Sequence, residues 1–178
     1  ENQLIRIAKD TGYAGAMLKL AEFYTGKRYK NKKNEEKSKY WKEEAVKAGD
    51  FESIIDHYGF SDYDVSSGDY NEIIQNLQTA EEKAVSKEIK DGITHMKGIV
   101  YFKMGNTDAA KQLFADISLP ELANESKYMT FQCLKREINA AAAEKILEEL
   151  ESGEFEIPAD DYLWLYNSYA AKRDSEPD

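Results

Sequence analysis

Two stretches of the chain repeat the same four-residue steps toward a glycine, and this spacing constrains the fold more than any other feature. The stepped residues are Leu4, Ala8 and Gly12 in the first stretch and Trp41, Ala45 and Gly49 in the second. Residues four apart lie on one face of a helix, and glycine is the residue that most readily ends one. Because the pattern returns after about 37 residues, it predicts a stack of helical hairpins rather than a globule with one centre.

The composition supports an all-α class and excludes several kinds of protein. Of 178 residues, 42% are hydrophobic and 33% charged, which is enough to bury a core. A net charge of -10 argues against a nucleic-acid partner, because such a surface needs a basic face. A mean hydropathy of -0.70, without a long apolar run, excludes a membrane span. The single Cys133 excludes an intramolecular disulfide.

The first complete hairpin is expected between residues 13 and 49. One helix should run from about Gly12 to Tyr24, and its small side chains would let a neighbouring helix approach closely. A basic loop, 27–33, follows, and the second helix should run over 35–48 with Trp41 on its inner face. Such a charged loop is usually solvated, and gripping an acidic partner or lipid headgroups is the alternative.

The region 8–49 resembles a Sel1-like repeat, a relative of the tetratricopeptide repeat that is abundant in bacteria. The resemblance is most specific at the Trp41, Ala45 and Gly49 end. It departs from the family in the loop, where Arg28, Lys32 and Lys33 stand in place of a second glycine and an acidic residue. This departure puts in doubt whatever function the loop has in relatives.

A second stretch resembles the tetratricopeptide pattern of small residue, aromatic residue, turn, small residue and aromatic residue. The matching residues are Gly98, Tyr101, Gly105, Asn106, Ala110 and Phe114. Gly98 and Ala110 would lie where two helices cross, and Gly105 with Asn106 would form the turn, because both tolerate positive φ. The tryptophan and leucine expected near its start are replaced by Thr94 and Lys97.

These patterns together predict a right-handed α-solenoid of antiparallel helix hairpins with about eight or nine helices. Between the two matches, further helices are expected over 50–60 and over 70–90, and the last over 159–171 with Tyr162, Leu165, Tyr166 and Tyr169 on its buried stripe. The expected divisions of a single array over 1–173 are a partial repeat 1–12, a Sel1-like repeat 13–49, a degenerate repeat 50–90, a tetratricopeptide-like repeat 91–119, a degenerate repeat 120–153, a terminal helix 154–173 and a flexible tail 174–178.

Residues that could support catalysis or metal binding are scarce. His57 and His95 have no helix-spaced histidine or cysteine beside them, and a buried thiol is the expected state of Cys133. The segment 62–73 half imitates a calcium loop, but its glycine falls at position 7 instead of 6 and its last position is Ile73. We therefore expect no enzymatic activity, no cofactor and no metal.

The resemblance places candidate binding residues on the first helix of each hairpin, which lines the concave groove of tetratricopeptide arrays. These residues are His95, Ile99, Phe102 and Lys103, with Leu18 and Glu22 in the first complete hairpin. Exposed apolar side chains in such a groove would be natural anchors for a partner, whereas packing against the next hairpin is the alternative. Trp164 is either a terminal groove anchor or sealed against the preceding helix.

The expected function is that of an adaptor that binds a protein or peptide partner in this groove without catalysis. The alternatives are an immunity-type inhibitor that caps a bacterial toxin and a structural spacer in an envelope or secretion assembly. Because the chain begins at Glu1 in the middle of a repeat-like helix, we expect an excised fragment or a processed export product. This favours a periplasmic or exported location and leaves a cytoplasmic one open.

Overall fold

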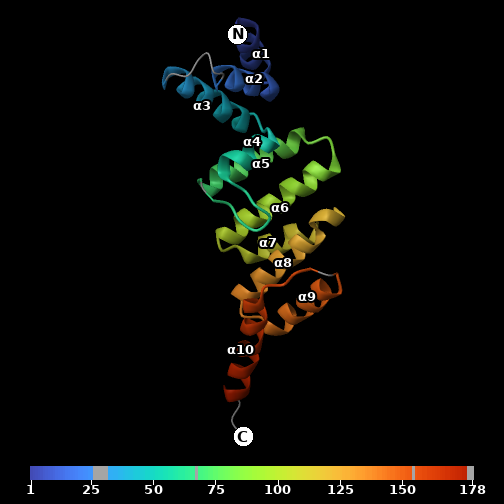
Figure 1. Cartoon of the computed structure of the whole chain (residues 1–178). Coiled ribbons are helices and arrows are strands. Elements are labelled where there is room, and N and C mark those ends of the chain that lie inside the picture. Colours follow the sequence, from blue (N-terminus) through green and yellow to red (C-terminus); the bar gives the residue numbers. More distant parts are fainter. Residues whose placement is uncertain (26–31, 67, 154, 176–178) are drawn as a thin grey trace. The chain divides into compact units, whose positions relative to one another are not determined.

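A computed structural model describes residues 1–25, 32–66, 68–153 and 155–175, and these residues are almost entirely helical (Figure 1). The helices are α1 (Asn2–Thr11), α2 (Ala14–Thr25), α3 (Lys32–Lys47), α4 (Phe51–Tyr58), α5 (Tyr70–Lys83), α6 (Lys87–Lys103), α7 (Thr107–Ala115), α8 (Pro120–Arg136), α9 (Ala140–Ser152) and α10 (Ala159–Ser175). Outside them, the described residues contain one isolated β-bridge, between Phe60 and Val65. The all-α prediction is confirmed.

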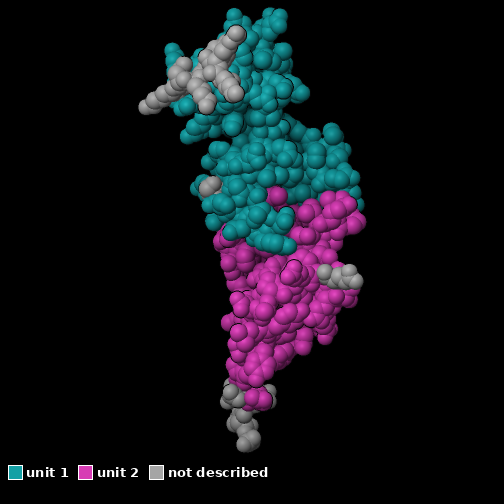
Figure 2. Space-filling model, in the orientation of Figure 1, with its two compact units in different colours: residues 1–93 teal, residues 94–178 magenta. Residues whose placement is uncertain are grey.

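The chain divides into two compact units, unit 1 over Glu1–Ile93 and unit 2 over Thr94–Asp178, shown in two colours in Figure 2. The division falls inside α6, so this helix contributes residues to both units. Successive helices pack together from α1 to α5 in unit 1 and from α7 to α10 in unit 2. The division of 1–173 into successive repeats stays a prediction.

Three helices of unit 1 end at glycines, and the sequence pattern marked two of them, Gly12 and Gly49. Gly12, Gly49 and Gly59 all have φ near the left-handed region, at 64°, 76° and 63°. At Gly49 and Gly59 the following amide bonds back to the preceding turn, from Asp50 N to Ala45 O and from Phe60 N to Ile55 O. A helix end closed by these backbone hydrogen bonds needs a residue that tolerates positive φ, which explains the glycines.

The core between α1, α2 and α3 combines four alanines with a few large side chains, Trp41 among them. Its buried members are Ala8, Ala16, Met17, Leu20, Ala21, Tyr24, Trp41 and Ala45. Ala45 and Leu20 are fully buried, and Trp41 is 6% exposed, which confirms its predicted place in the core. Alanines at the crossing points let the helices approach closely, as the sequence pattern indicated.

Two expected boundaries of unit 1 are wrong. The helix expected over 70–90 is two helices, because α5 ends at Ala84 in an extended conformation (φ −67°, ψ 119°) and Ser86 Oγ accepts a hydrogen bond from Ile89 N in the first turn of α6. The described residues hold ten helices rather than eight or nine. The helix α3 begins at Lys32, before the expected position 35, and most of the basic loop 27–33 lies outside the described residues.

Gly98 is predicted to lie at a helix crossing with Phe114 filling the space beside it, and in unit 2 the Phe114 ring packs directly against Gly98. A Cβ atom built on Gly98 would lie 2.5 Å from the Phe114 ring, so α6 and α7 approach too closely there for any side chain. Gly105 forms the expected turn with φ 82°, and Asn106 caps α7 by accepting a hydrogen bond from Ala109 N at 3.2 Å.

A single residue other than glycine adopts a positive φ among the described residues, and it ends α8. Ile138 has φ 58°, and the bonds around it, Ile138 N to Lys135 O and Asn139 N to Leu134 O, match those at Gly49. A β-branched residue is strained in this conformation. Ile138 thus forms a strained turn that leads into α9. Asn139 caps that helix by accepting a hydrogen bond from Ala142 N.

Candidate functional site

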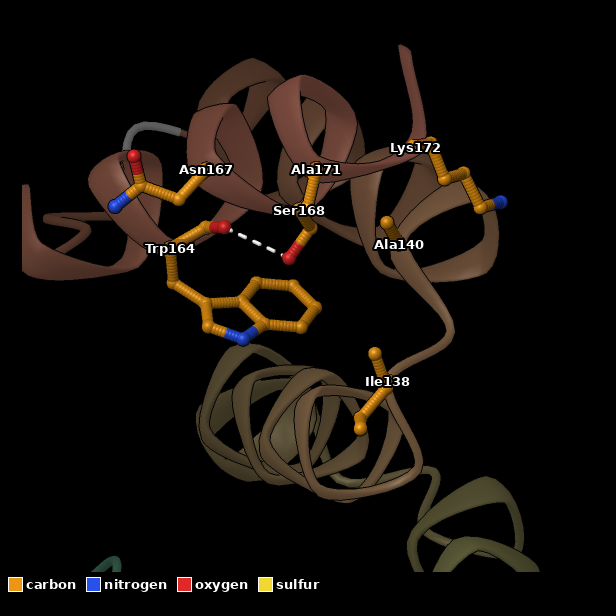
Figure 3. A pocket seen from close by; sticks show the side chains of 7 residues that line it. All are labelled: Ile138, Ala140, Trp164, Asn167, Ser168, Ala171 and Lys172. Carbon is orange, nitrogen blue, oxygen red and sulfur yellow. Dashed lines mark hydrogen bonds between the residues drawn. The ribbon is translucent and has the colours of Figure 1, made fainter. Parts of the chain in front are cut away.

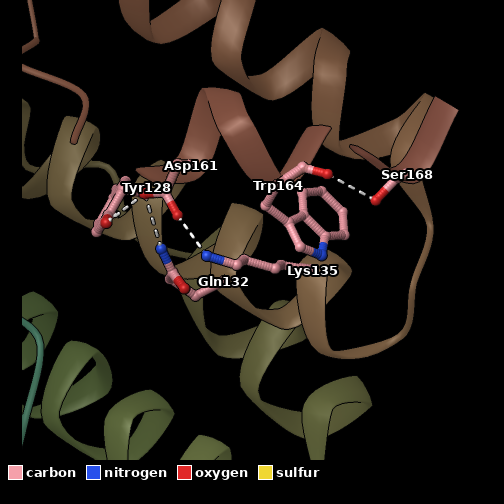
Figure 4. Close-up of polar contacts among 6 residues, drawn as sticks. All are labelled: Tyr128, Gln132, Lys135, Asp161, Trp164 and Ser168. Carbon is pink, nitrogen blue, oxygen red and sulfur yellow. Dashed lines mark hydrogen bonds and ion pairs between the residues drawn. The ribbon is translucent and has the colours of Figure 1, made fainter. Parts of the chain in front are cut away.

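The last helix, α10, is fixed to α8 by a buried carboxylate in its first turn. Asp161 is 3% exposed and accepts hydrogen bonds from Tyr128 Oη at 2.7 Å, Gln132 Nε2 at 3.3 Å and Lys135 Nζ at 2.6 Å (Figure 4). All three donors come from α8. A carboxylate buried in this way is stable only with its partners in place, so the cluster sets the rotation of α10 about its own axis.

Next to this cluster, Trp164 packs against the aromatic core of unit 2. Its ring lies edge-on to Phe131 with centroids 6.0 Å apart, and Lys135 Nζ lies 5.9 Å from the indole centroid. Leu165 joins the same core, and Ser168 Oγ donates a hydrogen bond to Trp164 O at 2.8 Å. The inner face of α10 is therefore formed by Asp161, Trp164, Leu165 and Ser168.

An open groove of about 500 Å³ lies beside the outer edge of the indole. Its lining residues are Ile138, Ala140, Trp164, Asn167, Ser168, Ala171 and Lys172. Figure 3 shows the indole between α10 and the segment that carries Ile138. The side chain of Ile138 is 76% exposed, so the strained turn presents an apolar group to solvent at this groove. Strained residues with exposed side chains often belong to binding sites.

The opposite face of α10 is aromatic and exposed. Tyr166 is 69% exposed, Leu163 56%, Tyr162 40% and Tyr169 36%. A helix with apolar residues on every side is normally buried on every side, and α10 is not. The face formed by Tyr162, Leu163, Tyr166 and Tyr169 is called the α10 outer face below.

Two of these tyrosines are hydrogen-bonded to carboxylates of α9. Tyr162 Oη donates to Glu151 and Tyr169 Oη to Glu144, both at 2.6 Å. The hydrogen bond to Glu151 raises the pKa of Tyr162 to about 12, and the bond to Glu144 raises the pKa of Tyr169 above its ordinary value. Both phenols therefore stay protonated at neutral pH and act as donors.

The buried stripe predicted for the last helix is wrong. Of Tyr162, Leu165, Tyr166 and Tyr169, only Leu165 belongs to the core, and the three tyrosines face outward. Periodicity could not find the true inner face, because it includes two polar residues. The burial of Asp161 depends on donors from α8, and Ser168 donates its hydroxyl to Trp164 O within α10. Trp164, predicted as either an anchor or a sealed residue, packs on Phe131 with one edge and lines the groove with another.

The groove predicted around Ile99 is not present at that residue. Ile99 is fully buried and His95 is 1% exposed, so neither presents a surface to a partner. His95 Nδ1 lies 3.0 Å from Ser126 Oγ, and its ring is 5.5 Å from that of Phe114. Both residues therefore belong to the interior, which was the alternative left open for them.

Phe102 and Lys103 lie nearer the surface and are partly buried. The Arg136 guanidinium is 4.0 Å from the centroid of the Phe102 ring and donates a hydrogen bond to Phe102 O. Arginine thus already covers one side of this ring, which reduces its value as an anchor.

The two candidates from the first complete hairpin lie in unit 1. Leu18 lines a small cavity of about 160 Å³ with Lys42, Val46, Ser53, Asp56 and His57. Glu22 is exposed and forms an ion pair with Lys19 at 3.0 Å. The structure thus brings Leu18 and Glu22 together in one unit, and Trp164 belongs to the other.

Cys133 and the candidate metal ligands remain to be placed. Cys133 is fully buried, and this burial raises the pKa of its thiol to about 12, as expected for a structural cysteine. Within the described residues, no group of three or more histidine, cysteine and acidic side chains is placed to hold a metal ion. Each helix in the same residues is too short or too polar to cross a lipid bilayer.

Comparison of the chain with protein-family models, with curated proteins and with solved structures gave no match. The geometry of the site therefore carries the functional argument.

Proposed function

We propose that this chain is a non-catalytic protein-interaction module that binds a protein partner through α10. The observation that carries the proposal is the α10 outer face, where Leu163 and Tyr166 expose more than half of their side chains. Exposed aromatic residues that a rigid scaffold holds in place are favourable anchors, because little conformational entropy is lost when they are buried.

The anchoring of α10 supports this proposal. Asp161 and its three donors from α8 fix the inner face, so the outer face is held in one orientation before any partner binds. The groove beside Trp164 lies on the same helix and adds an apolar depression of about 500 Å³. A depression of this volume is within the range of ligand-binding pockets, and aromatic residues are enriched in the buried centres of protein interfaces.

The fold supports the proposal in a second way. We infer that the hairpins are Sel1-like and tetratricopeptide-like repeats stacked as a right-handed solenoid. Support comes from the Trp41 and Gly49 pattern in the core of unit 1 and from the close contact of Gly98 with Phe114. Arrays of this kind serve mainly as binding scaffolds. The proposed binding surface is α10 instead of the groove expected around Ile99.

Site-specific photo-crosslinking tests this proposal. A photoreactive phenylalanine analogue at position 163 or 166, in the source cell, should give a discrete adduct with one partner protein. The matched control is position 85, because Val85 is 95% exposed, apolar and outside unit 2. Adducts at none of the α10 positions, or equal adducts at position 85, would contradict the proposal and favour a spacer. A toxin in the adduct would favour the inhibitor alternative.

A further inference from the structure

The α9–α10 pair carries two matched rows of side chains. Glu144, Glu148 and Glu151 follow the i, i+4, i+7 spacing on α9, and Tyr162, Tyr166 and Tyr169 follow the same spacing on α10. Each row therefore occupies one face of its helix. We call these six residues the tyrosine–carboxylate seam.

The two ends of the seam are closed by hydrogen bonds. Tyr162 pairs with Glu151 and Tyr169 with Glu144, so the two rows run in opposite directions and contact each other at both ends. The central residues, Tyr166 and Glu148, are both exposed. Glu148 lies between Glu144 and Glu151 on the same face of α9, and its charge contributes to the raised pKa of Tyr169.

The seam keeps its negative charge in the folded protein. Among the described residues, no ion pair joins Glu144, Glu148 or Glu151 to a cation. The neighbouring Glu149, by contrast, pairs with Lys127 of α8 at 2.9 Å. Three carboxylates thus border an exposed aromatic row that supplies no positive charge of its own.

This combination fits a cationic side chain. The face of a tyrosine ring attracts an ammonium or guanidinium group, and its apolar surface suits the methylene stem of lysine or arginine. A carboxylate beside the ring adds a charge-assisted hydrogen bond, which is stronger than one between neutral groups. Arginine gains most from such a site, because its planar group can stack on a ring and pair with a carboxylate at once.

We propose that the tyrosine–carboxylate seam binds a basic, arginine- or lysine-bearing segment of a partner protein, with Tyr166 and Glu148 as the central contacts. This inference rests on the proposed function, since it names the chemistry of the partner that α10 binds. The net charge of -10 acts in the same direction, because it attracts a basic partner over a distance at low salt.

Binding of two designed helical peptides to the whole chain tests the inference. Both peptides carry leucines on one face, and the other face carries arginines in one peptide and glutamates in the second. Fluorescence anisotropy should show binding of the arginine peptide that weakens as salt rises, and no binding of the glutamate peptide. Substitution Glu148→Gln or Tyr166→Leu should weaken binding about threefold, and the double variant about tenfold.

The matched control is Glu149→Gln, which removes the same charge from the same helix, outside the seam, and should leave affinity unchanged. If Glu149→Gln weakens binding as much as Glu148→Gln, the attraction belongs to the net charge and the inference is wrong. Equal binding of both peptides, or binding of neither, also overturns it. Those results would not contradict the proposed function. The crosslinking experiment tests that function separately, because it uses the natural partner and makes no assumption about the charge of that partner.

Discussion

Unit 1 and unit 2 join their helices by different means. In unit 1, α1, α2 and α3 meet through alanines, with Trp41 filling the space beside Ala45. In unit 2, the aromatic rings of Phe131 on α8 and Trp164 on α10 pack with leucines of α9, and Asp161 adds a buried carboxylate with three donors. Small apolar contacts stabilise close approach, whereas a buried charge also specifies orientation, since only one arrangement satisfies it.

The difference explains how unit 2 can present an aromatic surface. A helix as apolar as α10 would gain by turning Tyr166 and Leu163 inward, but that rotation would remove Asp161 from its donors and leave charges unpaired. The polar cluster therefore keeps the tyrosine row outside. In unit 1, by contrast, the residues that join the helices, such as Leu20, Trp41 and Ala45, are buried apolar side chains.

The largest effect is expected from Trp41→Ala in unit 1. Because the indole is 6% exposed in a core of small residues that cannot refill the space, the free energy of unfolding should fall by about 3–5 kcal/mol. Chemical denaturation measures the loss, and hydrogen exchange should quicken first in α2 and α3. Trp164→Ala, at a partly exposed indole, should cost less; an equal cost would remove the contrast between the units.

Asp161→Ala should follow, with a loss of about 2–3 kcal/mol. The substitution leaves Tyr128, Gln132 and Lys135 without their common acceptor, and the partial exposure of the lysine reduces the penalty below that of a fully buried pair. The control is Asp160→Ala, at the exposed neighbour, which should change stability by less than about 0.5 kcal/mol. Equal effects would show that the buried cluster does not fix α10.

Substitutions at the helix ends of the two units should change the free energy of unfolding in opposite directions. Gly49→Ala should cost about 2 kcal/mol, since φ is 76° and the new Cβ would lie 2.9 Å from the backbone of Thr79 and Ala80. Ile138→Gly should stabilise by about 0.5–1 kcal/mol, because it relieves the left-handed strain at an exposed residue. Thermal unfolding checks both; destabilisation by Ile138→Gly would mean that the isoleucine makes a compensating contact.

The smallest effect concerns two phenols whose pKa is raised to about 12 for different reasons. Burial is the main cause at Tyr24, and the hydrogen bond to Glu151 is the main cause at Tyr162. Glu151→Gln should therefore return the pKa of Tyr162 toward 10.0, whereas Glu1→Gln should leave Tyr24 still raised. NMR of labelled tyrosine rings measures both values, and a full return at Tyr24 would show that its burial matters little.

The sign of the pH dependence follows from these shifts. A raised phenol pKa means that the folded protein holds the proton more tightly than the unfolded chain. The contribution of Tyr162 to stability is thus complete below pH 10 and is lost as the pH rises toward about 12. Glu151→Gln should flatten this part of the stability profile.

Much of the fold could be predicted because its signals are local. Gly49, Gly59 and Gly105 mark helix ends through their own conformational freedom, and Trp41 follows an apolar stripe. The end of α8 escaped prediction because Ile138 occupies a position where glycine is the usual signal. The break between α5 and α6 escaped it for a similar reason, since the junction contains neither glycine nor proline.

The candidate site could be predicted only in part. Trp164 was found because it lies off the expected stripe, but the orientation of α10 depends on donors 26 to 33 residues earlier in the chain. No periodicity within one helix contains that information. For Ile99 the sequence left a groove position and packing in the interior open, and the structure has it buried, because its exposure was inferred only from the family groove.

The state of Cys133 offers a practical consequence for work on unit 2. Its thiol is enclosed on α8 and resists ionisation, so thiol reagents should leave it intact while the helix stays folded. Dyes can then be attached to cysteines introduced on the surface without first removing the native one. When α8 opens, the same sulfur becomes reactive. The rate at which a thiol reagent modifies Cys133 therefore measures how fast α8, the helix that holds α10, opens.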